Sequence, residues 1–555
     1  MKVLQQDARQ TTNFFTEDET LQQLLDMMLD KELFVYAKRE LTDFGELCAG
    51  AIDVRAKHTD REGEPRLQRY NAYGEEVSEV WVNEGYKKTI EETYNTGIVG
   101  YVHKNIPQLG RKGNYVYSFA QGYLLSHAEP GFYCPVTLTM ATAYLLDHYA
   151  SEELKQRFLP HVCATGDTEL YEGATFLTER QGGSDVGANI VKARQDGQHY
   201  LMYGEKYFAS NVGMCGVAMV LARIEGASTG SKGLTLFAVP WRLDNGKINN
   251  LRIRRLKDKL GVRAVPSGEV EFDGSLAYVV GEPNKGIYYM LEALNLSRIC
   301  NAVASIGIMR RGFLEAKHYV TNRNAFGQPL IQYPMIQDTL GKYAAKVHVE
   351  VATVFDLIQL YDRVTSGQGD EQDMILNRLN IAIMKKETAE QAVHYASEAI
   401  ELHGGNGYIE DFVTPRLLRD AQVLTVWEGT ANILALELIR LVDKYFAHEL
   451  FVRVMHERLT KLANGSLVQI VEEQLAKLEG TLQIFSCLDE ATKSYEAKGV
   501  AEKMAHLYES VVAVEWAAKF GGKYEKLADI YLENTWALRE IGAPMKTVQY
   551  FSDIM

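Results

Sequence analysis

A single carboxylate stands in an apolar stretch of the chain. Glu428 lies between two apolar runs, formed by Val423, Leu424, Val426 and Trp427 before it and by Ile433, Leu434 and Leu436 after it. A carboxylate there costs free energy unless it is paired, protonated or needed for chemistry. An acid that merely precedes a helix N-capped by Thr430 would be exposed. The apolar neighbours favour the other interpretation, a general base with a raised pKa that takes a proton from carbon.

A second candidate is the glycine-rich segment HGGNGYIEDF, which begins at His403 directly after an expected helix. One glycine at that position is an ordinary helix C-cap. Three glycines in four positions also let backbone amides approach a phosphate or a dinucleotide closely. Both interpretations stay open, but no strand precedes the segment, so it is not a Rossmann fingerprint.

Two further segments carry hydroxyl, amide and aromatic groups. FLTERQGGSDVGAN (Phe176 to Asn189) is either a polar surface turn or a loop that turns Thr178, Gly183 and Ser184 towards a polar ligand. GEKYFASNVG contains Phe208 and Ser210, which are either a core aromatic and a strand-end serine or groups that flank a flat ring.

The elements that must position these residues form four regions. Residues 1–165 are predicted to be mostly helical, and in SEELKQRFLP Ser151 is the expected N-cap and Pro160 the expected stop. Short alternating runs between glycines predict a central β-domain over 166–285. Helical periodicity returns over 286–445, where one face of a long helix carries Leu379, Ile383, Val393, Ala396 and Ile400. Residues 446–555 are expected to add a helical extension.

The bulk properties exclude several classes of protein. A net charge of −14 over 555 residues argues against a basic nucleic-acid surface, and the basic run RIRRLKDKLGVR is expected to be a solvated face beside acids. The six cysteines form no CxxC pair and the histidines have no ligand spacing, so neither a disulfide framework nor a metal is expected. The start has no targeting segment and no run is long enough to cross a membrane, which predicts a cytoplasmic protein.

Taken together, the segments resemble the acyl-CoA dehydrogenase flavoprotein family. FLTERQGGSDVG is similar to its TEPxxGSD loop, GEKYFASN to its GxKxWITN strand, and NRNAFGQPLIQYPMIQ to its RxxFG segment. ELHGGNGY and RDAQVLTVWEGTAN resemble the closing QxxGGxG and YEGT elements. The RQGGSDV, LKDKLG, WEG and RYNAYGEEV variants resemble the AidB-like branch. The resemblance implies an α+β fold with an N-terminal helical domain, a central β-domain and a C-terminal four-helix bundle, here with an extra helical extension.

The resemblance also implies a reaction and a cofactor. Glu428 matches the glutamate that removes the α-proton of an acyl-CoA thioester, after which hydride passes from Cβ to N5 of FAD and trans-2-enoyl-CoA results, as in fatty acid β-oxidation. The substrate is expected to contact Ser184, Arg298, Glu428 and Gly429. The residue before Arg298 is Ser297 rather than the glutamate that serves some branches as the base, which favours Glu428.

The contacts with FAD are carried over in the same way. The positions that match the family's FAD contacts are Leu177, Thr178, Gly183, Ser184, Phe208, Ser210, Arg323, Phe326, His403, Gly404, Gly405, Thr430 and Asn432. Some of them match contacts from a neighbouring subunit, so a homodimer or homotetramer is expected. Four residues depart from the family pattern: Arg180, Glu401, where many members have a glutamine, and the adjacent Tyr333 and Pro334.

Three functions stay open at this point. The first is a dehydrogenase that passes its electrons to an electron-transfer flavoprotein. The second is an AidB-like flavoprotein with a nucleic-acid-associated or stress role, although acids outnumber bases over residues 446–555. The third is an acyl-CoA oxidase that uses oxygen directly. The sequence does not indicate the length or branching of the acyl chain.

Overall fold

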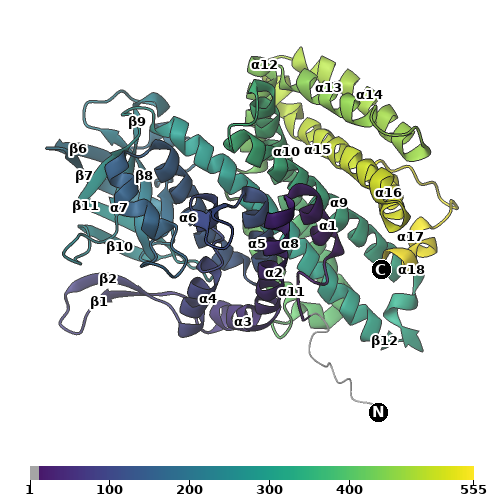
Figure 1. Cartoon of the computed structure of the whole chain (residues 1–555), viewed down its shortest axis with the longest axis horizontal. Helices are drawn as coiled ribbons and strands as arrows, with labels where there is room; N and C mark the ends of the chain where they lie inside the picture. Colours follow the sequence, from purple (N-terminus) through teal and green to yellow (C-terminus); the bar gives the residue numbers. More distant parts are fainter. Residues whose placement is uncertain (1–11) are drawn as a thin grey trace. The chain divides into compact units, whose positions relative to one another are not determined.

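The structure is a computed structural model that describes residues 12–555 (Figure 1). Residues 1–11, in which no targeting segment is expected, lie outside the described part. The chain forms two compact units: unit 1 consists of residues up to Ala49 together with Asn301–Met555, and unit 2 is Gly50–Cys300. Helix α8 (Gly286–Asn322) begins in unit 2 and ends in unit 1.

Unit 2 is built around a seven-stranded sheet, counted over the described residues. Its order is β10-β11-β7-β6-β8-β5, and β9 pairs with both β11 and β8. β5 and β6 each run parallel to β8, and the other pairs are antiparallel. The strands are β5 (Glu172–Phe176), β6 (Lys192–Asp196), β7 (His199–Ser210), β8 (Cys215–Ile224), β9 (Leu234–Pro240), β10 (Leu251–Leu256) and β11 (Ser267–Val280). These runs confirm the predicted strand-rich region.

The core of this sheet explains why the central strands are so apolar. All seven residues of β9 are buried, and Phe176, Val220 and Phe237 belong to the same hydrophobic cluster. A strand covered on both faces reads as a continuous apolar run rather than as an alternation. β10 has an exposed basic side instead, and its arginines pair with acids of β7 and β11, as expected for a solvated face.

Apart from the start of α8, the α-helices of unit 2 precede the seven-stranded sheet in sequence. They are α3 (Asp53–Arg61), α4 (Glu84–Tyr94), α5 (Tyr115–Ala128), α6 (Pro130–Tyr149) and α7 (Glu152–Val162). Every residue of α5 is buried. Ser151 caps α7 as predicted, because its Oγ accepts a hydrogen bond from the amide of Leu154, 3.3 Å away. Pro160 does not end α7, which continues to Val162.

The sequence did not predict the hairpins of this region. β1 (Arg66–Tyr70) pairs with β2 (Glu76–Trp81), and β3 (Asn105–Ile106) pairs with β4 (Arg111–Lys112). In the first hairpin, the side chain of Asn71 accepts hydrogen bonds from the amides of Tyr73 and Glu75. Local side-chain bonds of this kind form a turn even where charged residues hide the strand alternation.

Unit 1 is helical apart from the hairpin of β12 (Asn324–Ala325) and β13 (Gln328–Pro329), within the part of the chain that the structure describes. Besides the end of α8, its helices are α1 (Glu19–Met28), α2 (Lys31–Leu47), α9 (Pro334–Thr365), α10 (Glu371–His403), α11 (Thr414–Leu424), α12 (Ala431–Tyr445), α13 (Ala447–Leu459), α14 (Ser466–Ser486), α15 (Glu490–Phe520), α16 (Gly522–Thr535), α17 (Lys546–Gln549) and α18 (Phe551–Ile554). α13 to α18 therefore share one compact unit with the bundle helices.

Helix α10 is the central helix of unit 1. It packs against α9, α11, α12 and α15. The predicted apolar face holds for Leu379, Ile383 and Ala396, which are buried, whereas Val393 and Ile400 are half-buried. Helices on several sides also bury polar residues, so the middle of α10 is covered all round rather than on one face. Among residues 12–555, no helix has both the length and the apolar surface required to cross a membrane.

Candidate active site

Glu428 lies in the short loop between α11 and α12, in unit 1. Its φ is 59°, and that of Gly429 is 102°. A non-glycine residue in the left-handed region costs about 1–2 kcal/mol, and such residues cluster at active sites. The sequence predicted a buried carboxylate, but Glu428 is half-buried and Val426 is 58% exposed. The apolar neighbours are divided between the end of α11, the turn and α12. Leu424 and Leu434 are buried, whereas Val426 and Leu436 are exposed, so they form no continuous apolar wall.

The rest of the helix framework fixes both sides of this loop. Before it, Nδ2 of Asn301 on α8 donates to the carbonyl of Leu424 at 3.1 Å. After Glu428, Nζ of Lys385 on α10 donates to the carbonyl of Gly429 at 2.7 Å. Thr430 occupies the N-cap of α12, as predicted, through its extended backbone rather than through its hydroxyl.

The loop after β5 carries several predicted cofactor residues in unit 2. Gly183 and Ser184 are exposed, and a methyl group at position 183 would lie 2.6 Å from Oγ1 of Thr178. The amide of Tyr207 donates to the carbonyl of Thr178 at 2.9 Å. The structure thus brings this loop beside the end of β7, where Phe208 and Ser210 follow.

A buried ion pair holds this loop from inside. Nζ of Lys206 lies 2.9 Å from Oε1 of Glu179 and 3.1 Å from the carbonyl of Leu177. Glu179 also accepts hydrogen bonds from the amides of Ile190 and Val191. Burial lowers the pKa of Lys206 to about 8. The segment is therefore an internally fixed loop with an exposed rim, not a simple polar turn.

The end of β7 presents an aromatic ring. Phe208 is 55% exposed, so the interpretation of this residue as a core aromatic was wrong. Its ring lies edge-on to Tyr207, with centroids 5.2 Å apart, and Nζ of Lys257 is 3.3 Å from the Tyr207 centroid. Ser210 is paired across the strands with Ser267, and their Oγ atoms are 3.0 Å apart.

A hollow of about 440 Å³ lies beside the same loop. It is lined by Ser184, Asp185, Val186, Gly187, Ala188, Gly230 and Ser231. Arg298, which is also in unit 2, is buried on α8, and its Nη1 donates to Oδ1 of Asn295 at 3.3 Å. Glu428 and Gly429 belong to unit 1, so the predicted substrate contacts are divided between the two units.

Two of the predicted cofactor residues of unit 1, Arg323 and His403, both contact Tyr319 near the end of α8. The ring of Tyr319 stacks on that of His403, with centroids 4.4 Å apart, and the carbonyl of Tyr319 accepts from the amide of Arg323 at 2.9 Å. His403 is buried, and its Nδ1 lies 2.6 Å from the carbonyl of Ala399. The imidazole therefore packs inside the unit. Asn432 is exposed in the first turn of α12.

The glycine segment after α10 contains the helix C-cap considered for it, and its role towards a phosphate stays a prediction. Gly404 caps α10 with a φ of 58°, as an ordinary helix terminus does. A methyl group at Gly407 would lie 2.4 Å from the carbonyl of Ile400, so that glycine permits close packing. Gly404 and Gly405 are exposed, and a methyl group at either would meet no described atom within 4 Å.

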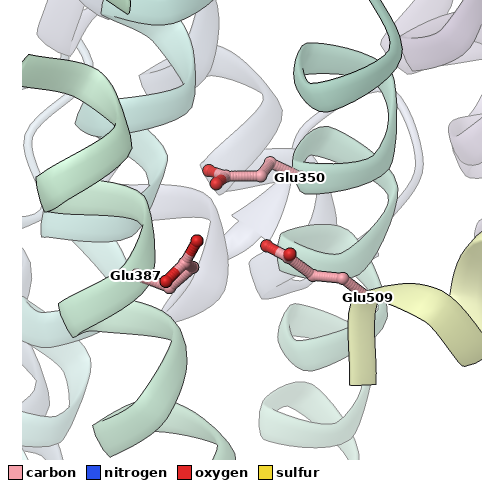
Figure 2. Close-up of side chains that lie close together, drawn as sticks. All are labelled: Glu350, Glu387 and Glu509. Carbon is pink, nitrogen blue, oxygen red and sulfur yellow. The ribbon is translucent and has the colours of Figure 1, made fainter. Parts of the chain in front are cut away.

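A buried charge cluster connects three helices of unit 1. The carboxylates of Glu350 on α9, Glu387 on α10 and Glu509 on α15 point towards one another (Figure 2). Nζ of Lys346 lies 2.9 Å from Glu350, 2.9 Å from Glu387 and 2.8 Å from Glu509. The lysine ammonium supplies the positive charge at the centre of the cluster, and the cluster ties the C-terminal helix α15 to the bundle.

Sequence reasoning missed Lys385 and the pair of Lys206 with Glu179. The available signal was a charged residue inside an apolar periodic run, as in NIAIMKKETA around Lys385. A lysine within such a run is usually buried only with a partner. The sequence does not reveal which backbone carbonyl or carboxylate that partner is, because it lies on another element.

Three protein-family models match this chain. The family model described as acyl-CoA dehydrogenase, middle domain, matches residues 174–275, and the acyl-CoA dehydrogenase C-terminal domain matches 284–442. A third model, the adaptive response protein AidB N-terminal domain, matches residues 5–166. Together these models cover the helical, strand-rich and second helical parts of the chain.

Individual relatives match over most of their length. Acyl-CoA dehydrogenase family member 11 of Caenorhabditis elegans is 31% identical over 77% of this chain and 70% of its own. AidB of Escherichia coli (strain K12) is 31% identical over 73% of this chain and 74% of its own. The crystal structure of Caenorhabditis elegans ACDH-11 in complex with C11-CoA has a TM-score of 0.86 at 26% identity, covering 96% of this chain and 93% of that one.

Proposed function

Because the chain belongs to the acyl-CoA dehydrogenase family, we propose that it oxidises the Cα–Cβ bond of an acyl-CoA thioester to a trans-2-enoyl-CoA, with Glu428 as the base for the α-proton. Membership of this family confirms the predicted resemblance and makes the chain an FAD-dependent oxidoreductase with the family's three-part fold. When bound, FAD supplies the acceptor for the hydride that leaves Cβ.

The residues present fit an FAD molecule. In unit 2, the exposed ring of Phe208 offers a flat apolar surface, and Thr178 and Ser184 offer hydroxyl groups beside it. In unit 1, Arg323 and the backbone at Gly404 and Gly405 are exposed and suit a pyrophosphate. Glu401 is an exposed acid near these glycines, where it cannot donate to a phosphate.

The observation that carries the proposed role of Glu428 is its backbone. A left-handed glutamate followed by a left-handed glycine costs conformational energy, and the framework fixes this turn on both sides. A half-buried glutamate on a fixed turn is accessible to a substrate and starts from a defined backbone position. Those are the properties that a general base for a carbon acid needs.

The test is anaerobic titration of the purified FAD-loaded protein with acyl-CoAs from short and branched to long. Bleaching of the flavin spectrum supports the proposal, and the tightest responder names the substrate class. Glu428→Gln should bind the same acyl-CoA but reduce the flavin about 10²–10⁴-fold more slowly. Glu449→Gln, which changes an exposed acid on α13, is the matched control. Normal reduction by Glu428→Gln would refute the assigned base.

We further propose an electron-transfer flavoprotein as the electron acceptor. Direct use of oxygen would instead produce hydrogen peroxide without an added acceptor, and this assay separates a dehydrogenase from an oxidase. We also propose a homodimer or homotetramer, which is supported by exposed apolar side chains near the predicted pyrophosphate residues. Phe326 is 97% exposed, and Tyr408 is 83% exposed.

A second candidate function is an AidB-like role in association with nucleic acid. It is favoured by the match to the AidB N-terminal domain model and by the similarity to AidB of Escherichia coli (strain K12). The overall charge of −14 opposes it, because nucleic-acid binding relies on a basic surface. Salt-dependent binding of duplex DNA, measured on a protein that no acyl-CoA bleaches, would favour this role over the first.

A further inference from the structure

Lys385 is a buried cation beside the proposed base. It lies in the middle of α10, only 1% exposed, and Ile383 and Met384 next to it are buried as well. Its Nζ donates to the carbonyl of Gly429 at 2.7 Å. Burying an ammonium group costs several kcal/mol unless strong hydrogen bonds replace its water. The hydrogen bond to Gly429, the residue after Glu428, therefore offsets part of the free energy that burial of this ammonium costs.

The turn that receives this bond needs to be held. Two successive left-handed residues are intrinsically unfavourable when the first is not glycine, so the turn relaxes unless its surroundings over-determine it. Asn301 holds the residue before the loop through the carbonyl of Leu424. The carbonyl of Gly429 is the corresponding point on the other side of Glu428. Its orientation sets the peptide plane that leads into α12, and this restricts how far the backbone at Glu428 and Gly429 can move.

We propose that Lys385 is a positioning residue for the reaction: its ammonium fastens the Gly429 carbonyl and so holds the Glu428 carboxylate in its working direction. This inference rests on the proposed function, because it concerns the aim of the base. The lysine itself does not need to touch substrate or FAD. A displacement of about 1 Å at the reacting atoms is enough to slow a reaction about 10²-fold.

The neighbouring lysine provides a matched control. Lys386 lies on the same helix and is 5% exposed, so it is similar in length, charge and burial. Its Nζ lies 2.8 Å from Oε2 of Glu390 and 3.7 Å from Oε2 of Glu502, on α10 and α15. A variant at either position removes one buried ammonium from α10, but only the variant at 385 removes the bond to the Glu428 turn.

The experiment compares Lys385→Met, Lys385→Arg and Lys386→Met as FAD-loaded full-length proteins. The first readout is hydrogen–deuterium exchange of peptides covering residues 425–432, which does not depend on activity. The second is the rate of flavin reduction by the best acyl-CoA, measured together with the acyl-CoA concentration that gives half the maximal rate.

For Lys385→Met we expect exchange in 425–432 to rise about tenfold, as the loss of a charged hydrogen bond implies. We expect the limiting reduction rate to fall about 10–100-fold, with the half-saturating concentration and FAD content unchanged. Lys385→Arg, which keeps a donor, should recover part of the rate. Lys386→Met should match the unmodified protein in both readouts.

Several results would overturn the inference. The first is an unchanged exchange rate at 425–432, or an unchanged flavin reduction rate, in Lys385→Met. The second is an equal change of both readouts in Lys386→Met, which would indicate that α10 is destabilised in general. If Lys385→Met does not fold, Lys385→Arg becomes the test. A lowered reduction rate in Lys385→Arg, with faster exchange at 425–432 and unchanged FAD content, supports the inference. A rate and exchange equal to those of the unmodified protein, or loss of FAD without a change in exchange at 425–432, overturns it. Faster exchange in Lys385→Met alone, in a protein whose flavin no acyl-CoA reduces, would support the fastening of the turn while refuting the proposed function.

Discussion

Nζ of Lys206 lies 2.9 Å from Oε1 of Glu179, and both side chains are almost completely withdrawn from solvent. The pair connects β7 to the loop after β5. It also reaches the carbonyl of Leu177, the residue before Thr178. The exposed groups proposed to meet FAD in unit 2 are thus held from behind by a charge pair that does not itself face outward.

Breaking this pair should release the loop. Replacing one partner, as in Glu179→Gln or Lys206→Met, leaves an uncompensated buried group and should lower the free energy of unfolding by about 3–5 kcal/mol. FAD affinity should fall as well. Thermal denaturation and FAD titration of the apoprotein measure the two effects. The double variant should lose less than the sum of the single losses, whereas Arg180→Gln, which breaks an exposed pair with Glu205, should change stability little.

Phe208→Ala should separate stability from cofactor binding. The side chain is 55% exposed, so its loss should change the free energy of unfolding by no more than about 0.5 kcal/mol. The loss of an aromatic face beside the flavin should weaken FAD binding about tenfold. Flavin fluorescence titration measures this change. Phe176→Ala, at a buried position of the same domain, should instead lower the free energy of unfolding by about 3–5 kcal/mol. If FAD binding were weakened only in the Phe176 variant, the assignment of Phe208 would be contradicted.

Glu350→Gln should change how stability depends on pH. Burial beside Glu387 and Glu509 raises the pKa of Glu350 to about 8, against the opposing effect of Lys346. The folded protein therefore holds a proton that the unfolded chain releases above its ordinary pKa of about 4.3. The free energy of unfolding should fall as pH rises from about 4.3 to about 8, by up to about 1.4 kcal/mol per pH unit.

The glutamine variant mimics the protonated form and should lack this decline. Thermal midpoints of both proteins between pH 5 and 9 provide the measurement. They should converge at pH 5, and the variant should be the more stable one at pH 8. Glu490→Gln, at an exposed position on α15, should follow the unmodified protein throughout. Parallel curves for Glu350→Gln and the unmodified protein would show that Glu350 is charged in the folded state.

Phe326→Asp should weaken assembly if the β12–β13 hairpin contacts a second copy. The residue has a φ of 49° and is 97% exposed, at the tip of a hairpin held by the bond from Tyr333 Oη to the carbonyl of Ala325. A buried charge would disfavour the contact. Sedimentation velocity should show a shift towards the monomer. Tyr73→Asp, at a position 90% exposed in the β1–β2 turn, is the control and should leave the mass unchanged.

The strands of the central domain and the long helices could be predicted because their apolar period survives in the sequence. The N-cap at Ser151 could also be predicted, because residues close in the sequence determine a helix cap. Glu428 was predicted to be the base from its chemistry, and that role stays a proposal; its burial was overestimated. The directions of the apolar side chains around Glu428 depend on the left-handed backbone of Glu428 and Gly429. No local sequence pattern predicts a left-handed glutamate.

The residues that escaped prediction form their bonds across long sequence separations. Lys385 on α10 binds the carbonyl of Gly429 in the loop before α12. Lys206 on β7 pairs with Glu179 in the loop after β5. One sequence shows that a charge sits within an apolar run, but not which partner compensates it. The first hairpin escaped because the alternation in RYNAYGEEV is obscured by charges, while Asn71 forms the turn.

The cluster around Lys346 also has a consequence for shortened versions of the chain. A fragment ending at residue 445 would keep Lys346, Glu350 and Glu387 but would lose Glu509, together with Tyr531, whose hydroxyl bonds to that carboxylate. The apolar surfaces of α9 and α10 that pack against α15 would then be exposed, and Lys346 would lose its ion pair with Glu509. The C-terminal helices therefore belong to the same compact unit as the proposed base, and a fragment without residues 446–555 should be less stable than the full chain.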